Sequence, residues 1–155
     1  MEGGGTGGKG SSQLTSNNDG TVADGSAVQN VTLTIYARVE IKGKTGTFAN
    51  LLITRGSKSI AMGTKSAPII MSSDDAGYDG SGEWGGLIIH GFAPHNECEV
   101  GGTYCDIDSE GESGFAGGYD EDDNSGVLNY VVVPEGGYEF STGNEINGSS
   151  SIRVV

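Results

Sequence analysis

Basic residues are almost missing from the second half of this chain. None of the eight Lys and Arg residues lies between Ser66 and Ile152, whereas seventeen Asp and Glu residues do, and the net charge of the chain is −13. Such a field repels phosphate backbones and attracts divalent cations, so we expect no nucleic-acid partner. Its simplest role is a solubilising acidic surface.

Long apolar runs and aromatic side chains are also scarce. No run approaches the roughly 18 residues that cross a bilayer, and the start at Met1 has neither the basic nor the apolar region of a signal peptide, so we expect no membrane span. Aromatics make up 7% of the chain and glycine 29 of 155 residues. This composition disfavours a core of large side chains and favours many short strands that share a thin aliphatic core.

Cysteine is limited to Cys98 and Cys105, with six residues between them. We expect a disulfide, which suits an extracellular or cell-surface protein better than a cytosolic one. A zinc site that adds His90 and His95 is the alternative, but the two cysteines lack the short spacing of structural zinc sites. Because His90 continues an apolar strand, we expect it at the solvent edge of that strand.

The apolar residues that are present form short runs separated by turn residues. Residues 1–29 are Gly, Ser, Thr, Asn and Asp with few apolar side chains, which predicts a flexible leader before a domain over 30–155. Residues 31–35 alternate with a period of two and are rich in β-branched side chains, which predicts a strand. Further short runs occur at 39–41, 51–53, 60–62, 69–71, 87–89 and 127–133.

The spacing of these runs predicts a repeat. Ile53, Met71 and Ile89 are each eighteen residues apart, which indicates stacked coils of about twenty residues. We therefore predict an all-β fold, a right-handed parallel β-helix (a solenoid) with coils about 4.8 Å apart. A β-sandwich is the alternative, but hairpin turns of the Asn-Gly type are not found between successive strands.

Residues 91–126 interrupt the repeat. They contain both cysteines, ten acidic residues and eight glycines but no apolar run, which predicts a loop insertion. Loops of this length are usually functional or disordered, and the expected disulfide would order part of this one.

Acidic clusters in this loop suggest calcium as a cofactor. Asp106, Asp108 and Glu110 are followed by Gly111, as a calcium-binding loop begins, although position twelve is Gly117 rather than Glu. A second cluster runs from 120 to 124, and a third contains Asp74, Asp75 and Asp79. The predicted metal ligands belong to the first two clusters: Asp106, Asp108, Glu110, Asp120, Asp122 and Asp123.

Aromatic residues suggest a second kind of ligand. Trp84, Tyr104 and Tyr119 are candidates for a platform that stacks on a sugar ring, with Tyr78, Phe92 and Phe115 as further aromatic residues, although Trp84 beside two glycines is more typical of a core residue. Hydrolysis of a polysaccharide requires two carboxylates about 5 to 9 Å apart. Lyase chemistry usually requires a Lys or Arg, which the acidic half lacks. We therefore assign no catalytic residues.

Three segments in order resemble one family: 82–94 (GEWGGLIIHGFAP), 122–131 (DDNSGVLNYV) and 143–148 (GNEING). Over about 31–148 the chain resembles exported bacterial β-helix proteins, which are typically predicted lipoproteins or surface proteins of unsettled function. The resemblance implies a right-handed parallel β-helix located outside the cytoplasm, and it carries no catalytic residue.

This chain looks like a truncated or reduced member of that family, because such proteins usually begin with a lipoprotein leader and continue through further coils. An uncapped coil exposes a strand edge, so we predict self-association. The predicted function is a secreted or surface-displayed structural or binding module, stabilised by calcium. The alternative is a carbohydrate-active module that binds or cleaves a polysaccharide.

Overall fold

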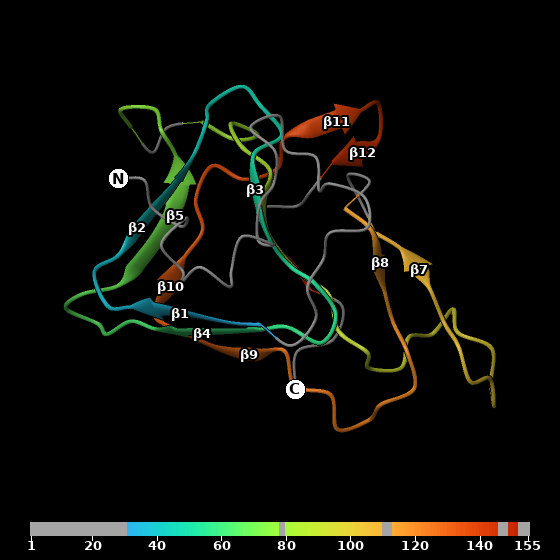
Figure 1. The fold of residues 1–155 in the computed structure, drawn as a ribbon. Coiled ribbons are helices and arrows are strands. Elements are labelled where there is room, and N and C mark those ends of the chain that lie inside the picture. Colours follow the sequence, from blue (N-terminus) through green and yellow to red (C-terminus); the bar gives the residue numbers. More distant parts are fainter. Residues whose placement is uncertain (1–30, 78–79, 110–112, 146–148, 152–155) are drawn as a thin grey trace.

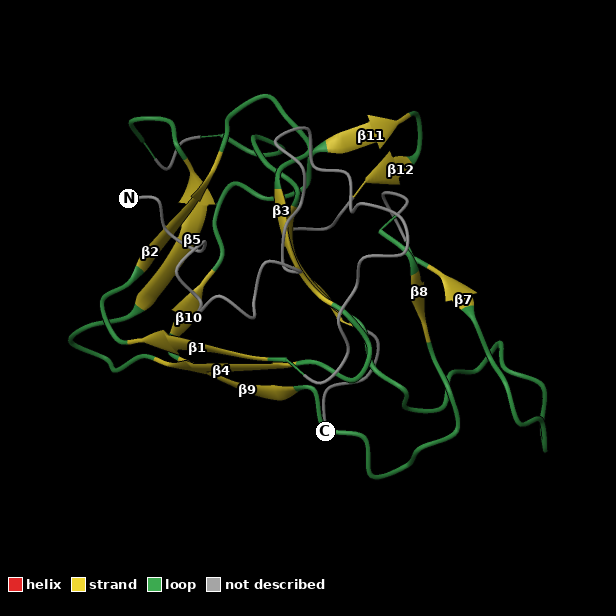
Figure 2. Ribbon diagram, viewed as in Figure 1, coloured by secondary structure: helices red, strands yellow, loops and turns green. Residues whose placement is uncertain are grey.

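The computed structural model describes residues 31–77, 80–109, 113–145 and 149–151. The predicted leader, 1–29, therefore lies outside the described residues. Every regular element in the described ranges is a strand, as Figure 2 shows, and no helix in these ranges has the length and apolarity needed to cross a membrane. The strands are β1 Thr32–Tyr36, β2 Glu40–Gly43, β3 Asn50–Ile53, β4 Lys58–Met62, β5 Ile69–Ser73, β6 Gly86–Ile89, β7 Ile107–Asp108, β8 Phe115–Ala116, β9 Gly126–Asn129, β10 Val131–Val132, β11 Glu139–Ser141, β12 Asn144–Glu145 and β13 Ser149–Ser151.

Nine of these strands form three parallel sheets of three strands each. The sheets have the orders β1-β4-β9, β2-β5-β10 and β3-β6-β13. In Figure 1 the first sheet runs along the lower side of the molecule, the second lies on the left, and β3 marks the third. The chain visits the three sheets in the same order three times, so each passage is one coil of a parallel β-helix.

The register shows that the predicted twenty-residue repeat is wrong. Between the first two coils Ile35 stacks on Ala61, Ile41 on Met71 and Ile53 on Ile89, which gives repeats of 26, 30 and 36 residues. Met71 thus belongs to a different sheet from Ile53 and Ile89. Each coil has three strands joined by turns of unequal length. The equal spacing of these three residues is therefore a coincidence and does not mark one coil.

The main core lies inside the three sheets. In β1 the predicted alternation is present: Leu33 and Ile35 are buried, while the residues between and beside them are exposed. Each aliphatic side chain removed from water in this way contributes about 1.5–3 kcal/mol of transfer free energy. The buried members of the core are Leu33, Ile35, Ile53, Ala61, Ile69, Met71, Trp84, Leu87 and Ile89.

A second, smaller core covers the outer face of β3 and β6. Leu52 and Ile88 are register partners on this face, and both pack with Phe48. The antiparallel pair β11–β12 closes over them, since Tyr138 joins the cluster and the Phe140 ring centroid lies 5.1 Å from that of Phe48. This cover explains why all four residues of β6 are buried.

Between β6 and β9 the chain leaves the three sheets. Residues 90–125 carry the short antiparallel pair β7–β8, which lies on the right in Figure 1. The chain rejoins the stack at Gly126, whose register partner is Ser59. Gly126 has φ +123, and a Cβ at this position would collide with the backbone of Ser59, so glycine is required for β9 to pair with β4.

Candidate functional site

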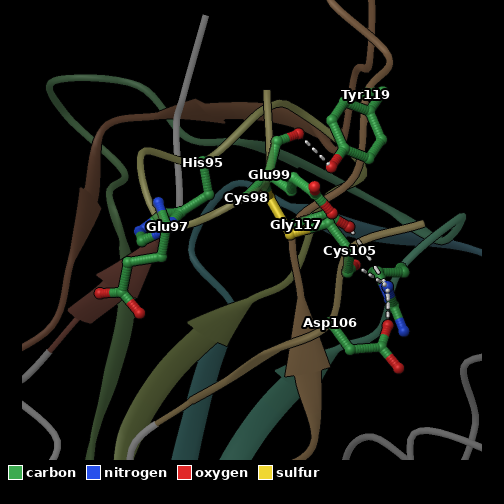
Figure 3. Close-up of a disulfide and its surroundings, with 9 residues drawn as sticks. His95, Glu97, Cys98, Glu99, Cys105, Asp106, Gly117 and Tyr119 are labelled. Carbon is green, nitrogen blue, oxygen red and sulfur yellow. Dashed lines mark hydrogen bonds and ion pairs between the residues drawn. A yellow bond between two sulfur atoms is a disulfide. The ribbon is translucent and has the colours of Figure 1, made fainter. Parts of the chain in front are cut away.

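The segment that leaves the stack is closed by a disulfide. Cys98 and Cys105 are bonded with a Cα–Cα distance of 5.5 Å, so the expected disulfide is confirmed. Figure 3 shows the bond with its surroundings. The zinc alternative is wrong because both sulfur atoms are used in the bond, and His95 accepts a hydrogen bond at Nδ1 from the backbone N–H of Glu97 at 3.2 Å.

Arg55, in the turn between β3 and β4, anchors the segment to the body of the protein. Its Nη1 lies 2.7 Å from Asp106 Oδ1 and donates to the carbonyl oxygens of Cys105 and Gly117, both at 3.2 Å. The guanidinium also lies 5.3 Å from the centroid of the Phe92 ring. One side chain from the β-helix thus holds three separate points of the segment; Figure 3 labels Cys105, Asp106 and Gly117, three of the residues that it contacts.

Tyr104 adds a contact to this anchor. Its hydroxyl donates to Asp106 Oδ2, and this hydrogen bond is the main reason that the pKa of Asp106 lies below its ordinary value, with Arg55 acting in the same direction. The same contact raises the pKa of Tyr104. Asp106 is therefore held as a carboxylate between a phenol and a guanidinium.

His90 ties the segment to the end of β6. Its Nε2 lies 2.8 Å from Ser109 Oγ, which in turn lies 2.8 Å from Ser113 Oγ and 2.8 Å from the carbonyl oxygen of Gly114. His90 is 2% exposed, so the prediction that it lies at the solvent edge is wrong. Burial, with a smaller effect of the Arg55 charge, lowers the pKa of His90 to about 4. This buried neutral imidazole helps to hold the segment in place.

The predicted calcium ligands that the structure describes have the following surroundings. Asp106 is occupied by Arg55 and Tyr104, Asp108 lies exposed in the strand β7 rather than in a curved loop, and Glu110 lies outside the described residues. In the second cluster Asp120 Oδ1 accepts the backbone N–H of Asp122 at 3.0 Å.

Asp123 instead joins the start of segment 90–125 to its end. Its Oδ2 accepts the backbone N–H of Phe92 at 3.0 Å and lies 3.3 Å from Ser125 Oγ. Within the described ranges no group of three or more His, Cys, Asp or Glu side chains is placed to hold a metal. Calcium at either loop cluster stays a prediction.

The three aromatic candidates differ in exposure and in hydrogen bonding. Trp84 is 1% exposed and its Nε1 donates to the carbonyl oxygen of Pro134 at 2.9 Å, so its ring is a core residue and offers no surface for a ligand. Tyr104 is 76% exposed. The Tyr119 hydroxyl donates to the carbonyl oxygen of Glu99 at 2.7 Å, which joins the end of the segment to its disulfide-closed part (Figure 3).

One aromatic residue is better placed than the sequence indicates. Phe115 is the direct register partner of Asp108 in the pair β7–β8, and both side chains are exposed. Residues opposite each other in an antiparallel pair lie on the same face. Their neighbours Ile107 and Ala116 lie on the other face, where Ala116 is fully buried. An aromatic ring and a carboxylate therefore lie side by side on the outer face of an anchored ribbon.

A hollow of about 220 Å³ lies where the segment rejoins the stack. The acidic residues Glu121, Asp122 and Asp123 line one part of it, and the apolar residues Ile89, Val127 and Leu128 line another. Its lining combines carboxylate and aliphatic side chains.

These features define an all-strand domain of the parallel β-helix class, with an acidic segment (residues 90–125) that leaves the stack and is anchored to it. A family model for pectate-lyase-like β-helix domains matches residues 10–154, and the chain belongs to this family. No curated protein and no solved structure gives a significant match. The family match confirms the resemblance to β-helix proteins.

Proposed function

We propose that this chain is an extracytoplasmic β-helix module that binds a polysaccharide on the outer face of β7–β8. The observation that carries the proposal is the exposed pair of Phe115 and Asp108 on one face of this ribbon. An aromatic ring can stack on the apolar face of a sugar, and a neighbouring carboxylate can accept hydrogen bonds from its hydroxyl groups.

The ribbon is held in position before any ligand binds. The disulfide closes a ring within the segment that carries the ribbon, and the Arg55 contacts and the His90–Ser109 contact fix this segment to the body of the protein. A preorganised surface loses less conformational entropy on binding, which favours a rigid binding face over a flexible loop. Membership of a family of pectate-lyase-like domains is compatible with a carbohydrate ligand.

The net charge of the chain indicates which class of polysaccharide it should bind. With a net charge of −13, and with Asp108 beside Phe115, the surface repels acidic sugars and favours neutral ones. The proposed activity is binding; cleavage of the bound polysaccharide is the alternative.

The location outside the cytoplasm is supported by the disulfide, because such bonds persist in oxidising compartments. We include the right-handed winding in the proposal, since connections between parallel strands of one sheet are nearly always right-handed. Self-association is included because Leu128, which stacks on the buried Ala61 in the third coil, is 40% exposed.

A glycan array followed by calorimetric titration with the best neutral glycan tests the proposal. We expect Phe115→Ala to weaken binding about tenfold or more, which corresponds to about 1.4 kcal/mol. Asp108→Asn should weaken it less. Tyr36→Ala is the matched control, because Tyr36 is an aromatic residue 73% exposed on β1, and it should bind as the unaltered protein does. Equal binding by the Phe115 variant, or no glycan bound at all, refutes the proposal; shortened glycan products would indicate an enzyme.

A further inference from the structure

Two glutamates converge on one buried serine away from the loop. Ser73, the last residue of β5, is 0% exposed. Its Oγ lies 2.7 Å from Glu83 Oε2 and 3.1 Å from Glu135 Oε2, and its backbone N–H donates to the same oxygen of Glu135 at 3.2 Å.

The backbone brings these carboxylates together from separate coils. The N–H of Glu83 donates to the carbonyl oxygen of Glu135 at 2.9 Å, and Trp84 forms a parallel bridge with Gly136. The segment before β6 and the segment after β10 are therefore paired side by side. Glu135 has φ 63, a left-handed conformation that non-glycine residues rarely adopt.

The arrangement leaves negative charge uncompensated. A hydroxyl has one hydrogen, so Ser73 can donate to only one of the two carboxylates at a time. Glu135 is 7% exposed, and its second oxygen, Oε1, is buried without any hydrogen-bond partner. Within the described part of the chain the one ion pair joins Arg55 to Asp106, so no basic side chain there neutralises Glu83 or Glu135. A buried carboxylate without a positive partner is strongly destabilising.

We propose that Glu83, Glu135 and the hydroxyl of Ser73 form a binding site for a divalent cation of the calcium class. Calcium takes six to eight oxygen ligands and tolerates irregular geometry, so backbone carbonyl groups and water complete the shell. Two carboxylates make this a weak site, with a Kd of about 1 mM, in the range of extracellular calcium modules. The site uses none of the acidic residues of segment 90–125, and it is independent of the proposed glycan-binding face.

Thermal unfolding in calcium chloride and in EDTA is the first test. We expect 10 mM calcium to raise the Tm of the full chain by about 5 °C, since a ligand that binds only the folded state stabilises it. Glu135→Gln, which keeps the shape and removes the charge, should abolish this shift, and so should Glu83→Gln. Glu40→Gln removes the same charge from an exposed position on β2 and should keep the shift.

Terbium luminescence gives a direct readout that does not depend on stability. Trp84 is the single tryptophan of the chain, and its ring lies against Gly43, the register partner of Ser73. Excitation of tryptophan should sensitise emission from bound terbium, calcium should compete for it, and either glutamine variant should lose it.

The proposal is overturned by an unaltered protein that shows neither a calcium shift nor terbium emission. It is also overturned if Glu135→Gln and Glu83→Gln both retain them, or if Glu121→Gln and Asp122→Asn lose them instead, because the cation would then belong to the loop.

Discussion

Acidification should loosen this protein through His90 as the pH falls from 6.5 to 4. The imidazole is 2% exposed and bonded to Ser109, and its pKa is lowered to about 4, mainly by burial and further by the charge of Arg55. In the unfolded chain the same group has its ordinary pKa of 6.5. The unfolded state therefore binds a proton first as the pH falls.

The size of the effect follows from the difference between the two pKa values. Each unit corresponds to about 1.4 kcal/mol, so neutral His90 accounts for about 3 kcal/mol that is fully present above pH 6.5 and is lost as the pH falls to 4. Asp74 and Asp106 have pKa values below the ordinary 3.8, so the stability that they contribute is lost only at lower pH. The window between pH 6.5 and 4 thus reports on His90.

Urea unfolding at half-unit pH intervals, followed by circular dichroism, measures this loss. His90→Gln keeps a hydrogen-bonding amide near Ser109 but cannot titrate, so its stability should change much less across the window. His95→Gln is the matched control and should keep the full dependence. The reasoning fails if the His90 variant and the unaltered protein show the same slope.

Two further predictions concern the stack itself. Gly126→Ala should destabilise the fold by at least about 3 kcal/mol, because the position combines a positive φ with a collision against Ser59. Gly46→Ala should cost about 1 kcal/mol, because Gly46 has φ +71 but open space around it. Denaturant unfolding measures both costs, and equal costs would contradict this prediction. Self-association should appear in light scattering as a mass that rises with concentration, and Leu128→Lys should reduce it; a monomer at every concentration would exclude it.

Local sequence signals predicted the parts of the fold that depend on neighbouring residues. The alternation at 31–35 and the short apolar runs identified strands, and the close pair of cysteines identified the disulfide. The repeat was misjudged because turn lengths differ within each coil, so equal spacing between Ile53, Met71 and Ile89 did not mean equal position.

The site was less predictable because its contacts join distant positions. Glu135 lies 62 residues from Ser73 in the chain, and no spacing rule connects them. Trp84 was predicted as a ligand residue although its two neighbouring glycines favoured a core position, and its burial in the structure agrees with the core position. The Phe115–Asp108 pair required the register of β7–β8, which two-residue strands do not reveal in a sequence.

The return of the chain at Gly126 has an evolutionary consequence. Ser125 Oγ lies 3.4 Å from the carbonyl oxygen of His90, so segment 90–125 leaves the stack and returns to it at nearly the same place. Its length and composition can therefore vary without any change in how the coils pile upon one another. Such a scaffold permits replacement of the whole segment by another of unrelated sequence, as antibodies vary their binding loops on a constant framework.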